Sequence, residues 1–256
     1  ASARAASVAE PGAGEPALVK VSFGYPGRAE PVLKEVDLRV RPGERLAVVG
    51  LNGAGKTTLV KLLAGLYAPQ SGTVGTARDA AVVFQDFARY PLPLRDNVRL
   101  GAPAHGGTDA DVLAALAAVD ALDLLEGLPH GLDTPLSRSF TGGRDLSGGQ
   151  WQKVALARAV YALDAGRRIL IVDEPTAHLD ARTEQEVFER LLERTRGRTL
   201  VLISHRFVTV RRADRIVVLD GGTVAEQGGH AELLAMGGRY ARWHRLQTSL
   251  IAGTNR

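Results

Sequence analysis

Residues 50–58 read Gly50-Leu51-Asn52-Gly53-Ala54-Gly55-Lys56-Thr57-Thr58 and fit the pattern G-x-x-x-x-G-K-[ST]. The stretch before it, 45–49, is short, apolar and rich in β-branched residues, so it predicts a buried strand. The stretch after it, 58–65, carries apolar residues at helical spacing and ends at a glycine, so it predicts a helix. A strand, a glycine-rich turn and a helix form the setting that this motif needs.

This arrangement predicts that the turn binds a phosphate chain. A helix N-terminus offers unpaired N–H donors and the positive end of the helix dipole. The glycines let the backbone approach the phosphate oxygens closely. We expect Lys56 to reach the β- and γ-phosphates and the Thr57 hydroxyl to ligand Mg²⁺. A glycine-rich turn that merely starts a helix is the alternative, but the flanking strand and helix favour binding of a nucleoside triphosphate.

The composition is that of an ordinary soluble globular protein. The 256 residues are 45% hydrophobic and 23% charged, and the length suffices for a full core, either one large domain or a core with an insertion. The absence of cysteine excludes disulfides and thiolate metal sites. The net charge of +4 is not gathered into a basic stripe, so we expect no nucleic-acid partner.

The ends of the chain suggest a longer polypeptide. No apolar run reaches the roughly 18–20 residues that a membrane helix requires, and no signal peptide is recognisable. The sequence begins with Ala1, and its only methionine is Met236. We therefore expect a piece of a longer polypeptide or a processed product, with any membrane part outside it. Residues 1–16 have a linker-like composition.

The second motif is acidic and follows the apolar run 169–172. This run predicts a strand buried on both faces. Asp173 at the end of such a strand is placed to hold Mg²⁺ through water. Because side chains alternate along a strand, Glu174 is expected to point elsewhere and to polarise an attacking water. A solvated strand end is the alternative interpretation. A third motif, Ser147-Gly148-Gly149-Gln150, opens a helix with a second amide-rich N-terminus. It has no lysine, so it is not a second complete phosphate loop, and a glycine-rich helix cap is the alternative interpretation.

Together these motifs, with Leu146 before the third, resemble an ATP-binding cassette (ABC) ATPase from about Leu18 to Gln247. The resemblance implies an α/β P-loop NTPase fold: a RecA-like core with a mainly parallel sheet, a trimmed antiparallel β subdomain and an inserted α-helical signature subdomain. It implies a linker at 1–16, the ATP-binding core at 17–88 and 161–250, the helical subdomain at 89–160 and a tail at 251–256. The stretch between Gly72 and Ala80 is shorter than is usual in the family.

The resemblance also implies a role for each motif residue, with ATP and Mg²⁺ as ligands. Tyr25 matches the aromatic residue that stacks on adenine, and Glu174, His205, Lys56 and Gln85 match catalytic positions. Thr57, Gln85 and Asp173 match the Mg²⁺ site, Asp173 acting through water. Leu179 and Asp180 match the loop that joins the two sites of a dimer. Direct ATP contacts are implied for Gly50, Asn52, Gly53, Ala54, Gly55, Lys56, Thr57 and Thr58, and contacts to ATP on the opposite subunit for Leu146, Ser147, Gly148, Gly149 and Gln150.

Stretches 84–90, 142–145 and 229–240 resemble the ATPase domains of exporters, although 141–145 matches only loosely. This implies a transmembrane permease domain, expected on the same chain before residue 1, whose coupling helices contact residues 86–97. It also implies a second cassette, identical or different, and a place at the cytoplasmic face of the plasma membrane. An importer ATPase and a soluble ABC ATPase outside transport are the alternatives. A cassette that does not hydrolyse ATP is expected to lose Glu174 or His205, and both are present.

Overall fold

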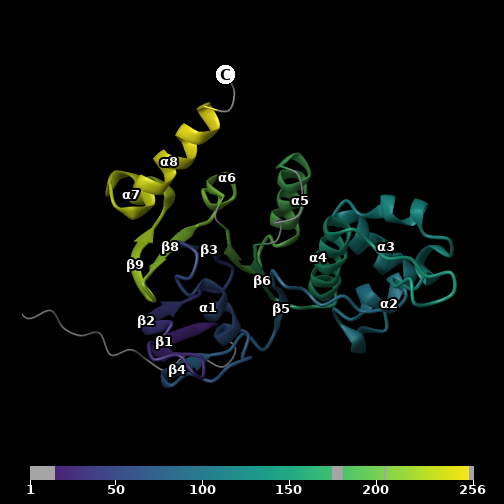
Figure 1. Cartoon of the computed structure of the whole chain (residues 1–256), viewed down its shortest axis with the longest axis horizontal. Coiled ribbons are helices and arrows are strands. Elements are labelled where there is room, and N and C mark those ends of the chain that lie inside the picture. Colours follow the sequence, from purple (N-terminus) through teal and green to yellow (C-terminus); the bar gives the residue numbers. More distant parts are fainter. Residues whose placement is uncertain (1–14, 175–180, 205, 254–256) are drawn as a thin grey trace, which may run out of the picture. The chain divides into compact units, whose positions relative to one another are not determined.

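The computed structural model describes residues 15–174, 181–204 and 206–253 of a mixed α/β chain (Figure 1). The chain divides into two compact units. The first contains the described residues up to 79 and from 206 onward, and the second contains those between 80 and 204. No helix in the described ranges has both the length and the apolar character to cross a membrane. Leu179, Asp180 and His205 lie outside the described residues.

The first unit contains an antiparallel sheet and a group of strands with mixed directions. The antiparallel sheet has the order β2 (Leu33–Arg39), β1 (Ala17–Phe23), β4 (Ser71–Gly75). In the second group β3 (Arg45–Val49) pairs in parallel with β8 (Arg215–Asp220). The apolar run 216–219, the turn sequence 220–222 and the stretch 223–225 predict a hairpin. The structure confirms it: a tight turn with two glycines at positive φ joins β8 to β9 (Thr223–Gly228).

Four helices accompany these strands: α1 (Lys56–Leu63), α6 (Phe207–Val210), α7 (His230–Ala235) and α8 (Arg239–Gly253). The inner residues of β3 and β8 pack with Val210 of α6, Leu233 of α7 and Tyr240 of α8 in one apolar cluster. This cluster anchors the end of β3, from which the glycine-rich turn begins.

The second unit has a parallel sheet of β5 (Ala80–Val83), β6 (Ile169–Asp173) and β7 (Thr199–Ile203). Every residue of β6 and β7 is buried, as expected for strands covered on both faces. The helices of this unit are α2 (Leu94–Arg99), α3 (Asp109–Ala118), α4 (Gly148–Asp164) and α5 (Ala181–Arg194), with 3₁₀ turns at Pro103–His105, Leu122–Gly127 and Gly131–Asp133.

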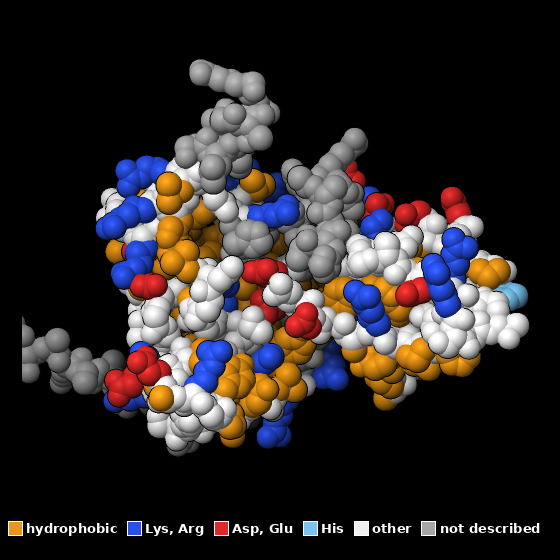
Figure 2. All heavy atoms as spheres, viewed as in Figure 1, with side chains coloured by type: hydrophobic (Ala, Val, Ile, Leu, Met, Phe, Trp, Pro, Cys, Tyr) orange, Lys and Arg blue, Asp and Glu red, His pale blue; other side chains and the backbone are white. Residues whose placement is uncertain are grey.

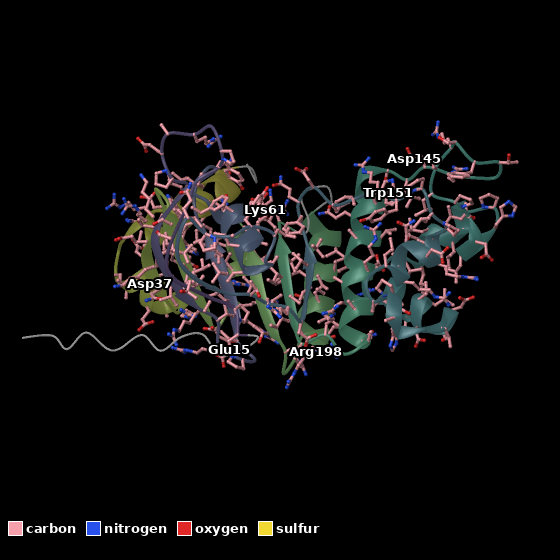
Figure 3. All side chains as sticks on the ribbon, turned by 90° about the horizontal axis from the view of Figure 1, so that it is seen from below. Glu15, Asp37, Lys61, Asp145, Trp151 and Arg198 are labelled. Carbon is pink, nitrogen blue, oxygen red and sulfur yellow. The ribbon has the colours of Figure 1, made fainter. Side chains whose placement is uncertain are left out.

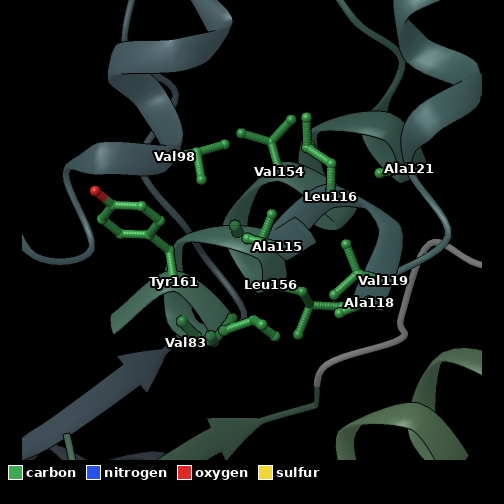
Figure 4. Packing of buried hydrophobic residues seen from close by; sticks show 14 of the residues in the cluster. Val83, Val98, Ala115, Leu116, Ala118, Val119, Ala121, Val154, Leu156 and Tyr161 are labelled. Carbon is green, nitrogen blue, oxygen red and sulfur yellow. The ribbon is translucent and has the colours of Figure 1, made fainter. Parts of the chain in front are cut away.

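Helix α4 lies at the centre of the second unit. It contacts α2, α3, β5 and β6, and Trp151, Leu156 and Tyr161 on it are fully buried. Figure 4 shows Leu156 and Val154 packed among Val98 of α2 and Leu116 of α3. Because this apolar cluster surrounds α4, the elements of the second unit pack around this helix.

Local signals in the sequence account for several helix starts. Thr108 followed three positions later by Asp111 predicts a capping box at the start of α3. The structure confirms it, since the Asp111 carboxylate accepts from the Thr108 amide at 2.7 Å and from its hydroxyl at 2.8 Å. The sequence after the third motif predicts a helix from about Trp151 to Ala162. In the structure this helix is longer and begins at Gly148. The reason is a second capping box at Ser147, described below.

Candidate nucleotide-binding site

The glycine-rich turn has a shape that only glycine permits at two positions. At Gly50 a Cβ atom would lie 2.3 Å from the Leu219 carbonyl oxygen, so no side chain fits between the turn and β8. At Gly55, which precedes α1, φ is +103°, a conformation that L side chains rarely adopt. These constraints hold the turn close to β8 and lead it directly into the first turn of α1.

Lys56 is the first residue of α1, and its side chain returns across the turn. The Nζ atom donates to the carbonyl oxygens of Gly50 at 2.9 Å and Leu51 at 3.1 Å. Only 7% of Lys56 is exposed, although Leu51 and Asn52 beside it are exposed. The ammonium group therefore stands at the centre of the turn, where a bound phosphate chain would meet a fixed positive charge.

Tyr25 lies beside this helix start. It follows β1, and its ring packs edge-on against Phe23 and Tyr67 with centroid distances of 5.1 and 5.7 Å. Its hydroxyl lies 3.1 Å from the Thr58 hydroxyl. The structure thus places Tyr25 next to the phosphate loop within the first unit, and the hydroxyl contact with Thr58 was not foreseen from the sequence, which separates the two residues by 33 positions.

In the second unit Gln85 follows β5, and Asp173 is the last residue of the neighbouring parallel strand β6. Val83 of β5 pairs with Val172 of β6, so both residues lie at the carboxyl end of the sheet. Gln85 is exposed, whereas Asp173 is only 1% exposed. The carboxyl edge of a parallel sheet is where α/β proteins bind ligands, and both side chains carry oxygen donors there.

The backbone conformation of Glu174 differs from the strand conformation that the sequence predicted for it. Strand β6 ends at Asp173, and Glu174 has a φ of +48°, while its amide donates to the Ile203 carbonyl oxygen at 3.0 Å. The prediction that Glu174 turns away from Asp173 by strand alternation is therefore wrong in its reasoning, because Glu174 is not in a strand. A glutamate in the left-handed region costs about 1 kcal/mol, and such positions cluster at functional sites.

The signature stretch begins α4 with a closed capping box. The Ser147 amide donates to Gln150 Oε1 at 2.9 Å, and the Gln150 amide donates to Ser147 Oγ at 3.3 Å. The glycines between them occupy the first two helical positions. The start of α4 is thus an ordered helix N-terminus formed by its own side chains.

Asp145 and Trp151 support this helix start, and the sequence gives no signal for their contact (Figure 3). The Asp145 carboxylate accepts from the Trp151 indole N–H at 3.0 Å and from the Leu146 amide at 2.8 Å. The bond from Trp151, followed by that from Leu146, lowers the pKa of Asp145. The buried indole therefore connects the stretch before the signature to the body of α4.

The predicted site residues fall in both units. Tyr25 and residues 50–58 belong to the first unit, whereas Gln85, residues 146–150, Asp173 and Glu174 belong to the second. In the first unit these residues lie beside one helix start, and in the second they lie at one sheet edge and at one helix start. Nothing in the structure addresses the positions of Leu179, Asp180 and His205.

Comparison with known proteins identifies the family. The model of the ABC transporter family matches residues 33–177. The "ATP-dependent lipid A-core flippase" of Thiobacillus denitrificans is 39% identical over 249 residues, covering 92% of this chain and 42% of the relative. The protein of the same name from Cupriavidus metallidurans is 42% identical over 241 residues, covering 89% and 40%.

A solved structure agrees with this result. The structure of a bacterial Atm1-family ABC exporter with ATP bound has a TM-score of 0.80 and 32% sequence identity, covering 93% of this chain and 43% of that one. The present chain spans about two-fifths of the length of these relatives. The chain belongs to the ABC transporter family and has its P-loop nucleotide-binding domain, as the resemblance of its motifs indicated.

Proposed function

We propose that this chain is the ATP-hydrolysing motor domain of an ABC exporter. The observation that carries the proposal is the phosphate loop, in which Gly50 and Gly55 shape the turn and Lys56 places its ammonium group at the centre. The relatives named as flippases and the exporter structure support export over import. The exported substrate would be selected by the transmembrane domain with which this chain is proposed to work.

ATP is expected to bind along the first unit. Its phosphates would accept from the backbone amides of residues 52–58, and Lys56 would exchange its contacts with backbone carbonyls for the β- and γ-phosphates. Tyr25 would stack on the adenine, because its ring already lies beside α1 and is held by Phe23 and Tyr67.

The donor set of this chain fits Mg²⁺. Thr57, Gln85 and Asp173 offer only oxygen ligands from their hydroxyl, amide and carboxylate groups, which this cation prefers. No group of three or more His, Cys, Asp or Glu that could hold a metal occurs in the described part of the chain. When bound, Mg²⁺ neutralises charge on the β- and γ-phosphates.

Hydrolysis needs a positioned water and stabilisation of developing charge. Glu174 would accept a proton from the attacking water, and the strained backbone at this residue fixes the direction from which its side chain starts. His205 would contact the γ-phosphate, and Lys56 would balance the negative charge that accumulates on the transferred group.

The complete site would form when two cassettes enclose two ATP molecules. Residues 146–150 would donate amides from the start of α4 to the ATP on the opposite subunit, and Leu179 and Asp180 would connect the two sites. A transmembrane permease domain, carried on the same polypeptide before residue 1, would place the chain at the cytoplasmic face of the plasma membrane. The partner cassette is either an identical or a different chain.

The variant Glu174→Gln tests this proposal, because it keeps the size of the side chain and removes the base. We expect steady-state ATP hydrolysis to fall at least about a hundredfold, since general-base catalysis contributes roughly 10²–10⁴-fold. We also expect an ATP-bound dimer to accumulate, measured by light scattering in saturating Mg-ATP. Glu126→Gln, at an exposed position, is the matched control and should keep full activity. A Glu174→Gln chain that hydrolyses ATP normally, or that stays monomeric with ATP, contradicts the proposal.

A further inference from the structure

Arg158 in the middle of α4 makes an unusual set of contacts to residues more than 60 positions earlier in the chain. Its Nε donates to the Asn97 carbonyl oxygen at 2.9 Å, and one terminal nitrogen donates to the Asn97 side-chain oxygen at 2.6 Å. The other terminal nitrogen donates to the Ala88 carbonyl oxygen at 2.7 Å. A single guanidinium therefore holds both ends of the segment 88–97.

Asn97 extends this contact along the segment. Its side chain is fully buried, and its Nδ2 donates to the carbonyl oxygens of Tyr90, Leu92 and Pro93 at 3.1, 2.8 and 3.3 Å. Because Asn97 also accepts from Arg158, the side chain amide connects the backbone of residues 90–93 to α4. Residues 90–93, which precede α2, are therefore fixed by polar bonds from a side chain of that helix.

Tyr90 provides a third contact. Its ring lies under the guanidinium of Arg158, with 4.9 Å between the guanidinium carbon and the ring centroid. Apolar side chains gather on the surface around α2, where Tyr90, Leu92 and Leu100 are each more than a third exposed (Figure 2). One side of the segment thus faces solvent, while the other side is bound to α4.

The partners of Arg158 within the described residues are carbonyl oxygens, an amide oxygen and an aromatic ring, none of them a carboxylate. Burial lowers the pKa of Arg158 to about 10, so the group stays charged at neutral pH. A partly buried guanidinium with such neutral partners is held by geometry, since its planar fork donates in several fixed directions at once. A lysine cannot make these three bonds together.

We propose that Arg158 is a positioning residue that joins the segment 88–97 to α4, so that a displacement of this segment moves the signature residues 147–150 at the start of the same helix. Gln85 precedes this segment and Ser147–Gln150 begin α4, so Arg158 links two parts of the site that are far apart in sequence. This inference rests on the proposed function for its consequence in ATP hydrolysis, but the contact itself is independent of that function.

Hydrogen exchange of the 256-residue chain tests the contact. Arg158→Lys keeps the charge and loses at least two of the three hydrogen bonds, so we expect amides in 88–97 to exchange roughly tenfold faster. The matched control is Arg190→Lys, which removes a similar guanidinium bond to the Ala117 carbonyl oxygen (3.0 Å) in the same unit but does not touch the segment. If Arg158→Lys does not fold, Tyr90→Leu removes the exposed ring and should give the same local acceleration to a smaller degree.

The transmission to the signature is tested by a cycle of ATPase measurements. Leu92→Gly loosens the backbone of the segment, and Ser147→Ala weakens the start of α4. With Arg158 present, the effects of these two changes on kcat should deviate from the product of the single effects by roughly threefold or more. In the background of the Arg158→Lys substitution, the two effects should multiply, while the KM for ATP stays the same.

Two results would overturn the inference: exchange in 88–97 that Arg158→Lys leaves unchanged or that Arg190→Lys accelerates equally, and a cycle that gives the same deviation with and without Arg158. A folded chain that hydrolyses no ATP would instead count against the proposed function. Hydrogen exchange would then still decide whether Arg158 holds the segment.

Discussion

The helices α1 and α4 both begin with glycine-rich sequence, yet their first turns are built differently. Helix α1 has Gly55 as its N-cap, with no side-chain hydrogen bond to its start and no acidic residue in its first turn. Helix α4 has Ser147 as its N-cap and Gln150 completing a reciprocal capping box. The first amides of α1 therefore have no side-chain cap, whereas those of α4 are capped by side chains of the same segment.

Under the proposed function, this difference predicts how each helix start would meet a phosphate. The start of α1 has a fixed cation, Lys56, and a backbone shaped by glycine, so ligand oxygens can complete it directly. The start of α4 is ordered by its own side chains and by the bond between Asp145 and Trp151. We therefore expect α1 to determine the affinity for ATP and α4 to affect hydrolysis with little effect on affinity.

The largest expected effect is that of Lys56→Ala. Removing the ammonium group should raise the Kd for ATP roughly a hundredfold, since a hydrogen bond from a charged donor contributes about 1.5–3 kcal/mol. Titration calorimetry of the chain with Mg-ATP measures this change. Lys34→Ala, which removes an exposed lysine on β2, is the control. Unchanged affinity in Lys56→Ala would reject the contact assigned to this residue.

A smaller effect on the same helix start is expected at Tyr25. Tyr25→Ala should raise the Kd for ATP by roughly tenfold, because stacking of a base on an aromatic ring contributes about 1–3 kcal/mol. Tyr25→Trp keeps an aromatic face and loses only the contact to the Thr58 hydroxyl, so it should bind ATP more tightly than the alanine variant. Equal dissociation constants for both variants would exclude a stacking role.

At the start of α4, Ser147→Ala should lower kcat several-fold and leave the Kd for ATP within a factor of about two. The loss of the N-cap should also destabilise the chain by about 1 kcal/mol. Thr108→Ala opens the equivalent capping box of α3 and separates the two effects, since it should cost similar stability without changing kcat. Urea unfolding and ATPase assays measure both quantities. Equal loss of kcat in both variants would show that only stability matters.

The smallest effect is expected for Trp151→Phe, which keeps a buried ring and removes the indole donor to Asp145. The melting temperature should fall by roughly 2–4 °C at pH 7. Because the folded-state pKa of Asp145 is lowered, its stabilisation is present above the unfolded pKa of about 3.9 and is lost as the pH falls through the lower folded value. The difference between variant and parent should therefore shrink below about pH 4. A constant difference down to about pH 2 would contradict the role of this bond.

Features encoded by neighbouring residues could be predicted from the sequence. The strand, turn and helix around Gly50–Thr58 follow from glycine placement and apolar spacing, and the structure confirms them as β3 and α1. The Thr108–Asp111 capping box and the hairpin of β8 and β9 are also local and also correct. The family followed from three short motifs, because each motif carries its own chemistry.

Contacts between distant residues could not be predicted in this way. The bonds from Arg158 to Asn97 and from Tyr25 to Thr58 join positions that no periodicity or spacing relates. The indole of Trp151 could equally have pointed to solvent or to the core. The conformation of Glu174 was missed because alternation applies only while a strand continues, and a strand end is decided by its neighbours rather than by its own residues.

The left-handed backbone at Glu174 has an evolutionary consequence. Glycine and asparagine adopt this conformation more easily than glutamate does, so a chance mutation to either would relieve strain in the backbone while removing the carboxylate. The backbone at this position therefore does not favour retention of the glutamate. Under the proposed function, selection to retain it would come from ATP turnover alone, and a duplicated copy released from that requirement would lose hydrolysis here while keeping its fold.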